Sequence, residues 1–243
     1  MAAKLNVLKT PDDVVLNLAH LFVTLSAQAI AKTGRFTVSL SGGSSPKKLY
    51  ELLASDTFKN KVEWTSVYFF FGDERYVPHD DKDSNYLMVK TALFDPLEIN
   101  SDNIFAVDTS KSPEGAAEAY TQTINKFFGD EPENFDLILL GLGDNSHTAS
   151  LFPHTPVLHD TSVSVKEVYL TDQQVYRITF TAPLINQAHH IAFLVYGDGK
   201  AEAVHHVLED ARNIEEYPAQ LIAPIHGDIT WYLDEAAAAK VKH

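Results

Sequence analysis

The histidine at position 147 stands in a segment that suits proton transfer. It lies in GLGDNSHTASLFP (141–153), where Gly143, Ser146 and Thr148 are expected to keep the chain tight around it, directly after an apolar run. An imidazole exchanges its proton near neutral pH, so a histidine fixed in such a loop can act as a general base. A lone histidine is more often structural than catalytic, and the groups gathered near it decide between the two.

The segment SGGSSPKKLY (41–50) has the composition of a phosphate-binding loop. Gly42 and Gly43 let backbone N–H groups approach a ligand closely, and Ser41 adds a hydroxyl. Pro46 favours the start of a helix, whose positive dipole end attracts anions. The same residues would also make an ordinary strand-to-helix turn, and the segment alone does not separate these two interpretations.

Several charged residues follow or lie on apolar runs elsewhere in the chain. Asp73, Glu74 and Arg75 come directly after one such run, and Lys200 stands at a predicted helix start after another. Arg177 lies within VYRITF, a predicted strand. A guanidinium can clamp a phosphate or carboxylate through two parallel hydrogen bonds, so the cations are candidates for binding an anionic ligand. Local ion pairs and exposed surface positions are the ordinary alternatives.

The hydropathy pattern predicts the scaffold that would hold these residues. Short, nearly continuous apolar runs suit strands of a parallel sheet with helices on both faces, and we expect strands at 36–40, 67–72, 136–141 and 190–197, with a further strand at 229–234. Apolar residues spaced three and four apart predict helices, and we expect these at 11–31, 46–54, 114–128 and 200–209, with a further helical segment at 235–242. Thr10 is the expected cap of the first helix, and 152–160 is the expected surface loop near the site.

Because strands and helices alternate, the predicted fold class is α/β, a three-layer, doubly wound and mostly parallel sheet of the Rossmann-like kind. We expect a single domain over residues 1–243. In such sheets ligands bind beyond the carboxyl ends of the strands. The loops that carry Gly42, Arg75, His147 and Lys200 should therefore meet in one crevice.

Composition narrows the class of ligand. The chain has 33 acidic and 19 basic residues and a net charge of −14, which disfavours nucleic acid and anionic membranes as partners. Cysteine is absent, and neither a metal-binding motif nor the GxSxG elbow of serine hydrolases occurs, so we expect no metal and no thiol or serine nucleophile. We find no apolar run near about 18 residues and no secretory signal, and expect a cytoplasmic protein.

Five long segments, in order along nearly the full length, resemble the 6-phosphogluconolactonases, which are relatives of glucosamine-6-phosphate deaminases and, more distantly, of ribose-5-phosphate isomerases. They are SLSGGSSPKKLYELL, FFGDERYVPHDDKDSNYLM, FDLILLGLGDNSHTASLFPH, YRITFTAPLINQAHHIAFLVYGDGKAEAV and YPAQLIAPIHGDITWYLDEAAA. The resemblance implies the fold of that superfamily. It further implies hydrolysis of 6-phospho-D-glucono-1,5-lactone to 6-phospho-D-gluconate in the oxidative pentose phosphate pathway, without metal or organic cofactor. We expect a monomer or a homodimer.

The resemblance also implies residue roles. By position, His147 resembles the general base that activates water, and the positions that surround the sugar phosphate correspond to Ser41, Gly42, Gly43, Arg75, Arg177 and Lys200. Family members usually read Asp-Gly-His where this chain has Asn145, Ser146 and His147. An Asn can orient the imidazole but supplies no charge, so either Asp73 or Asp144 takes over the role of the carboxylate, or the base is weaker.

Two other functions stay open from the sequence. The deaminase or isomerase chemistry of the relatives needs a carboxylate in the loop after the histidine, and no Asp or Glu occurs from Thr148 to Pro156, which favours the lactonase. A non-catalytic sugar-phosphate sensor would keep the anion site and lose the base. The presence of His147 favours an enzyme over such a sensor.

Overall fold

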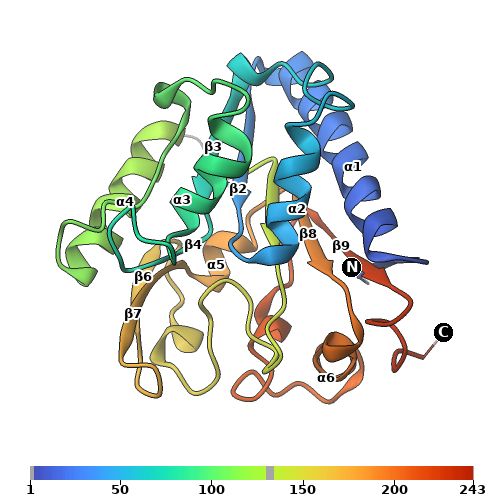
Figure 1. Cartoon of the computed structure of the whole chain (residues 1–243). Helices are drawn as coiled ribbons and strands as arrows, with labels where there is room; N and C mark the ends of the chain where they lie inside the picture. The colour runs from blue at the N-terminus through green and yellow to red at the C-terminus, as the bar shows by residue number, and fades with distance from the viewer. Residues whose placement is uncertain (1–2, 130–133, 243) are drawn as a thin grey trace.

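The computed structural model describes residues 3–129 and 134–242 and is built around one large sheet (Figure 1). This sheet has six parallel strands in the order β1-β9-β8-β5-β2-β3. The strands are β1 (Lys4–Leu8), β2 (Phe36–Leu40), β3 (Val67–Phe71), β5 (Leu137–Leu140), β8 (His190–Val195) and β9 (Asp228–Asp234). Every strand expected from the apolar runs is present. The edge strand β1 was not predicted, because its residues are exposed or only partly buried and carry no apolar run.

Side chains of the central strands alternate between two separate hydrophobic clusters, one on each face of the sheet. In β5, Leu137 and Leu139 belong to one cluster, whereas Ile138 and Leu140 belong to the other. The first face is covered by α1 (Pro11–Thr33), α2 (Ser44–Leu53) and α3 (Asn85–Val89), and the second by α4 (Pro113–Phe128), α5 (Ala182–Ile185) and α6 (Ala201–Glu209). The predicted three-layer, mostly parallel α/β architecture is therefore confirmed.

A second, three-stranded antiparallel sheet was not predicted, although VYRITF, expected as a strand, is one of its members. It has the order β4-β7-β6, with β4 (Asp73–Arg75), β6 (Val165–Leu170) and β7 (Val175–Phe180), and lies below α4 in Figure 1. One face packs on α4 through residues such as Val165 and Ile178. The pairing of β4 with β7 sets Arg75 directly opposite Arg177, which brings together two cations that are 102 positions apart in the sequence.

The remaining helical segments are single turns. They lie at Trp64–Ser66, Lys90–Phe94, Ser101–Asn103, Pro156–His159, Asp198–Lys200 and Pro218–Leu221. The turn at Pro156–His159 buries Val157 and Leu158, so the expected surface loop 152–160 is anchored in the core at its centre.

The prediction of a helical segment at 235–242 is wrong. The chain there makes consecutive turns, and the carboxylate of Asp234 accepts hydrogen bonds from the backbone N–H groups of both Gly197 and Ala237. A segment this short gains little from helix formation, and these tertiary contacts decide its path. The first helix, by contrast, begins as predicted, with Thr10 and Asp13 forming a reciprocal capping box.

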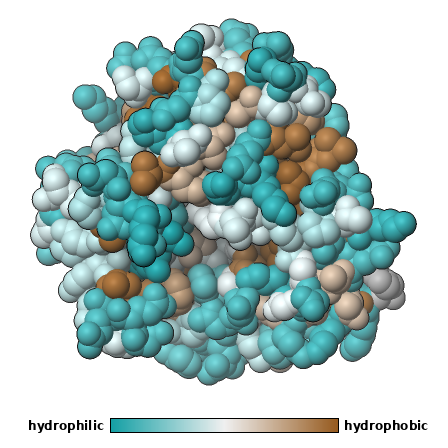
Figure 2. All heavy atoms as spheres, viewed as in Figure 1, coloured by the Kyte–Doolittle hydropathy of each residue, from teal (hydrophilic) through white to brown (hydrophobic). Residues whose placement is uncertain are grey.

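The expectation that no segment is apolar enough to cross a membrane needs correction. Within the described residues, α1 alone is long and apolar enough by length and composition. In the structure this helix lies against the sheet, where Val14, Leu18 and Phe22 are fully buried. On the face seen in Figure 2 hydrophilic residues predominate, and hydrophobic residues are exposed in small groups.

Candidate functional site

The carboxyl ends of β2, β3 and β5 open into a cavity of about 330 Å³. It brings together most of the residues predicted for the site, namely Ser41, Gly42, Gly43, Asp73, Arg75, His147 and Arg177. The cavity lies where the topology of a parallel sheet places ligand sites. We refer to it below as the carboxyl-end cavity.

Two predicted residues lie beside this cavity and do not line it. Asn145 is exposed, and its Oδ1 contacts Nδ1 of His147 at 2.5 Å. The Nζ of Lys200 donates a hydrogen bond to Asp144 Oδ1 at 2.6 Å, so its charge is already paired with a carboxylate. Lys200 therefore stands next to the histidine loop with its ammonium engaged.

The loop after β5 is as tight as its composition predicts. The N–H of Gly143 donates to the carbonyl of His147 at 2.8 Å, and the N–H of Ser146 donates to the carbonyl of Gly143 at 2.9 Å. A Cβ at Gly143 would lie 2.0 Å from Nδ1 of His147, so only glycine allows the imidazole this close to the backbone. Ser146 has a φ of 62°, in the left-handed region that favours glycine.

The surroundings of His147 favour a neutral imidazole with a free Nε2. An amide oxygen can only accept a hydrogen bond, so the contact with Asn145 places the ring proton on Nδ1 and leaves the lone pair on Nε2. Burial lowers the pKa of His147 to about 4, although the charge of Asp73 acts in the opposite direction. At neutral pH the ring is therefore unprotonated, which is the form that a general base requires.

Of the two carboxylates considered as partners of His147, Asp73 acts on it more strongly. Both raise the pKa of His147, with Asp73 ahead of Asp144, which is exposed and paired with Lys200. Asp73 is buried, and its Oδ2 accepts a hydrogen bond from Ser150 Oγ at 2.7 Å. The ring nitrogen Nδ1 itself is held by Asn145, so Asp73 influences the imidazole through space.

Glu74 has a structural role. It is 1% exposed, and its carboxylate accepts hydrogen bonds from the backbone N–H groups of Arg75, Asn85 and Tyr86. These bonds fix the start of α3 against β4. Burial nevertheless raises the pKa of Glu74.

Arg75 and Arg177 form a pair of cations at the cavity wall. Arg75 Nη1 donates to the carbonyl of Asp83 at 2.7 Å, and Arg177 Nη2 makes a longer contact of 3.4 Å with Gln173 Oε1. Within the described ranges neither guanidinium has a carboxylate partner, and Nε of Arg177 is buried without any hydrogen-bond partner. Burial, followed by the charge of Arg75, lowers the pKa of Arg177. The charges of Asp73, Glu74 and Asp83 act in the opposite direction. Two neighbouring guanidinium groups without a carboxylate at ion-pair distance suit a dianion such as phosphate.

The cavity also contains residues that the sequence analysis did not single out. Asn85 donates from Nδ2 to the carbonyl of Asp73 at 2.9 Å, and its buried Oδ1 lies where a Cβ of Gly42 would be. Ser150 bonds Asp73 across 77 positions of sequence, a contact with no local signal. Phe152 stacks on the imidazole of His147, and only its place five residues after the histidine hints at this.

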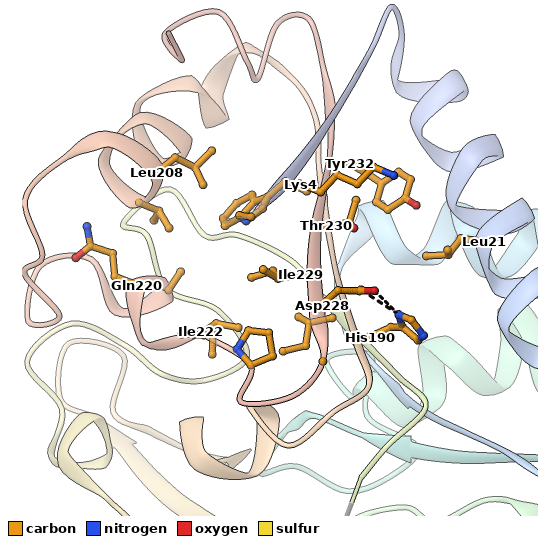
Figure 3. Close-up of a pocket in the computed structure, with 18 of the residues that line it drawn as sticks. Lys4, Leu21, His190, Leu208, Gln220, Ile222, Asp228, Ile229, Thr230 and Tyr232 are labelled. Carbon is orange, nitrogen blue, oxygen red and sulfur yellow. Dashed lines mark hydrogen bonds and ion pairs between the residues drawn. The ribbon is translucent and has the colours of Figure 1, made fainter. Parts of the chain in front are cut away.

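A larger cavity of about 570 Å³ lies at the opposite end of the sheet, by the amino ends of β8 and β9 (Figure 3). We call it the amino-end cavity. Its histidine, His190, has Nδ1 2.9 Å from both carboxylate oxygens of Asp228, the contact drawn as dashed lines in the figure. Apolar side chains such as Ile222 and Ile229 make up much of the remainder. In the part of the chain that the structure describes, no group of three or more His, Asp or Glu has the arrangement of a metal site.

Comparison with known proteins agrees with the fold and the loops. Residues 9–231 match the family described as glucosamine-6-phosphate isomerases/6-phosphogluconolactonase. A 6-phosphogluconolactonase of Nostoc sp. is 40% identical over 99% of this chain and 99% of its own length. Among solved structures, the devB protein superposes with a TM-score of 0.90 at 34% identity, covering 99% of this chain and 100% of its own.

The solved 6-phosphogluconolactonase from Trypanosoma cruzi also has this fold, with a TM-score of 0.88 and 28% identity over 100% of this chain and 99% of its own. The resemblance stated from the five sequence segments is thus confirmed over essentially the whole chain. The chain belongs to the glucosamine-6-phosphate isomerase/6-phosphogluconolactonase family.

Proposed function

We propose that this chain is a 6-phosphogluconolactonase, which hydrolyses 6-phospho-D-glucono-1,5-lactone to 6-phospho-D-gluconate in the cytoplasm, as a step of the oxidative pentose phosphate pathway. Relatives over the full length carry that name. The observation that carries the proposal is one cavity that holds both a neutral histidine with a free Nε2 and two neighbouring arginines without an ion-pair partner among the described residues. The first suits general-base chemistry, and the second suits a phosphorylated substrate.

The reaction needs one proton to be moved twice. Nε2 of His147 takes a proton from water as its oxygen attacks the lactone carbonyl, which gives a tetrahedral oxyanion and an imidazolium. When the bond from the carbonyl carbon to the ring oxygen breaks, the imidazolium returns the proton to that oxygen. Backbone N–H groups or cationic side chains at the cavity wall stabilise the oxyanion between these steps.

The substrate phosphate would bind at Arg75 and Arg177. A dianion there supplies the acceptor that Nε of Arg177 lacks and offsets the repulsion between the two guanidinium groups. The loop adds the backbone N–H groups of Gly42 and Gly43 at the start of α2, which has no side-chain cap, whereas the N–H of Ser41 donates to Tyr50 Oη. Lys200 contributes from a greater distance, because Asp144 holds it.

Asn145 would orient the base. Its Oδ1 fixes the proton on Nδ1 and thereby presents the lone pair of Nε2 to water. Asp73 would stabilise the imidazolium that forms during the reaction, because its buried carboxylate is the stronger of the two negative influences on the ring.

Deaminase or isomerase chemistry is the second candidate, and it fits the site less well. The loop after His147 has no carboxylate through Pro156, and the carboxylate that lines the cavity, Asp73, is occupied by Ser150. A non-catalytic sensor is the third candidate, because it would need only the residues that bind the sugar phosphate.

One set of measurements separates the three. Hydrolysis of 6-phosphogluconolactone by the wild-type protein should exceed the spontaneous rate, and glucosamine 6-phosphate should release no ammonia. Ammonia release would establish the deaminase instead. Binding of 6-phosphogluconate with no gain over the spontaneous rate would establish a sensor and contradict the lactonase.

A further inference from the structure

We propose that Phe152 is the positioning residue for His147, which holds the imidazole in its reactive orientation and shields it from water. This rests on the proposed role of His147 as the base. The two rings are stacked, with centroids 3.9 Å apart and planes 18° from parallel. Phe152 also belongs to the lining of the carboxyl-end cavity.

The chain between the two rings is built to bring them together. Leu151 is fully buried, and its N–H donates to the carbonyl of Thr148 at 3.0 Å, which closes a turn. Ala149, inside this turn, has a φ of 46°, in the left-handed region. The turn reverses the chain, so the residue that follows Leu151 returns over the residue that precedes Thr148. That pair is Phe152 and His147.

Anchors on both sides leave this turn little freedom. Thr148 Oγ1 donates to the carbonyl of Gly141 at 2.8 Å, and the N–H of Ser150 donates to Thr179 Oγ1 at 3.1 Å. Thr148 and Ser150 are each 1% exposed. Phe152 therefore stands on a fixed support, and a stacking partner held in this way restricts rotation of the imidazole.

Phe152 completes a three-sided enclosure of the ring. Gly143 lies so close to Nδ1 that no Cβ fits, Asn145 holds Nδ1, and Phe152 covers one face. Nε2 has no hydrogen-bond partner within the described protein and is left for water or substrate.

The enclosure also determines the charge state of the ring. Burial is the largest influence on the pKa of His147 and lowers it. The charged groups that act on the ring are divided: Asp73 and Asp144 raise its pKa, whereas Lys200 and Arg177 lower it. Removing the phenyl ring would admit water, weaken the largest influence and let the pKa return toward its ordinary value.

The test compares Phe152→Ala, Phe152→Leu and Phe152→Tyr with wild type. Titration of the His147 ring is followed by NMR in histidine-labelled protein, with His147→Gln to assign its signal. In Phe152→Ala the pKa should rise from about 4 toward the ordinary value of about 6.5. Leucine excludes water but does not stack, so Phe152→Leu should keep the low pKa, and Phe152→Tyr should keep both properties.

Kinetics supply the second readout. Phe152→Ala and Phe152→Leu should lower kcat by about 2- to 10-fold, the worth of one stacked aromatic pair, and Phe152→Tyr should restore it. In Phe152→Ala and Phe152→Leu, KM should change less than kcat, because Phe152 stacks on His147, although it also lines the cavity.

The outcomes are distinguishable. A higher His147 pKa in Phe152→Ala supports the inference even if wild type hydrolyses no lactone, a result that would overturn the proposed function alone. An unchanged His147 titration in Phe152→Ala overturns the inference, whether that variant melts at a lower temperature, as for a purely structural residue, or raises KM, as for a residue that only contacts substrate.

Discussion

The two named cavities at opposite ends of the sheet differ in whether their buried polar atoms have partners. Each contains a histidine whose Nδ1 is engaged, by Asp228 at His190 in the larger amino-end cavity and by Asn145 at His147 in the smaller carboxyl-end cavity. Among the described residues, Arg177 Nε and Asn85 Oδ1 in the carboxyl-end cavity are buried without a hydrogen-bond partner, and no residue that lines the amino-end cavity has such an atom. An unpaired buried polar group costs about 1–3 kcal/mol. These unpaired polar atoms, rather than the volume, distinguish the carboxyl-end cavity.

The largest expected effect is the loss of the base. His147→Ala should lower kcat/KM for 6-phosphogluconolactone by about 10²- to 10⁴-fold, the usual contribution of general-base catalysis. His190→Ala in the amino-end cavity is the matched control and should leave kcat/KM within about twofold of wild type. Equal losses of kcat/KM in the two variants would contradict the claim that the carboxyl-end cavity, and not the amino-end cavity, is the active site.

The next effect concerns the unneutralised arginine. Arg177→Gln should raise KM for the phosphorylated lactone by about 10- to 100-fold, the worth of charge-assisted hydrogen bonds, and should leave hydrolysis of unphosphorylated gluconolactone unchanged. Because burial and the charge of Arg75 lower the pKa of Arg177, the fold disfavours its charge, and the variant should melt at a slightly higher temperature when measured without substrate. An equal loss on both lactones would place the phosphate elsewhere.

A smaller effect should follow from adding charge at the orienting residue. A carboxylate on Nδ1 stabilises the imidazolium, so Asn145→Asp should raise the pKa of His147 and move the acid limb of kcat/KM upward by about one pH unit. Asn145→Ala removes the orienting contact without adding charge. It should lower kcat, and its acid limb should lie at a lower pH than the limb of Asn145→Asp. An unchanged profile in Asn145→Asp would exclude Asn145 from tuning the base.

The smallest effect is on stability. Ser146 has a φ of 62°, where a side chain is unfavourable and glycine is not. Ser146→Gly should stabilise the fold by about 0.5–1 kcal/mol, measured as a higher Tm. Gln174→Gly, at a φ of 55° in the β6–β7 turn and outside the histidine loop, should act in the same direction. A lower Tm in Ser146→Gly would show that the serine side chain stabilises the loop by other contacts.

The sequence predicted the large sheet well, because the central strands are short, nearly continuous apolar runs. The loops after these strands contained His147, Arg75 and the glycines of the phosphate-binding candidate, and the rule that ligands bind at carboxyl ends placed them together. The single domain over residues 1–243 and the cytoplasmic location stay predictions.

What the sequence did not predict depends on contacts between distant segments. The small sheet has short, mixed strands without a clear period, so the pairing of Arg75 with Arg177 had no local signal. The partner of Lys200 is Asp144, 56 residues away, and this pairing keeps Lys200 off the cavity wall. Stacking of Phe152 on His147 depends on the left-handed φ of Ala149, a conformation that alanine rarely adopts.

The pH dependence of kcat/KM in the wild-type protein, corrected for spontaneous hydrolysis, tests most directly whether a neutral His147 in the carboxyl-end cavity carries the reaction. Activity requires the unprotonated ring, so it should fall as the pH drops through the pKa of about 4 and stay level above that limb toward neutrality. The limb should be absent from the residual activity of His147→Ala. A wild-type limb that persists unchanged in His147→Ala would contradict the assignment of His147 as the base.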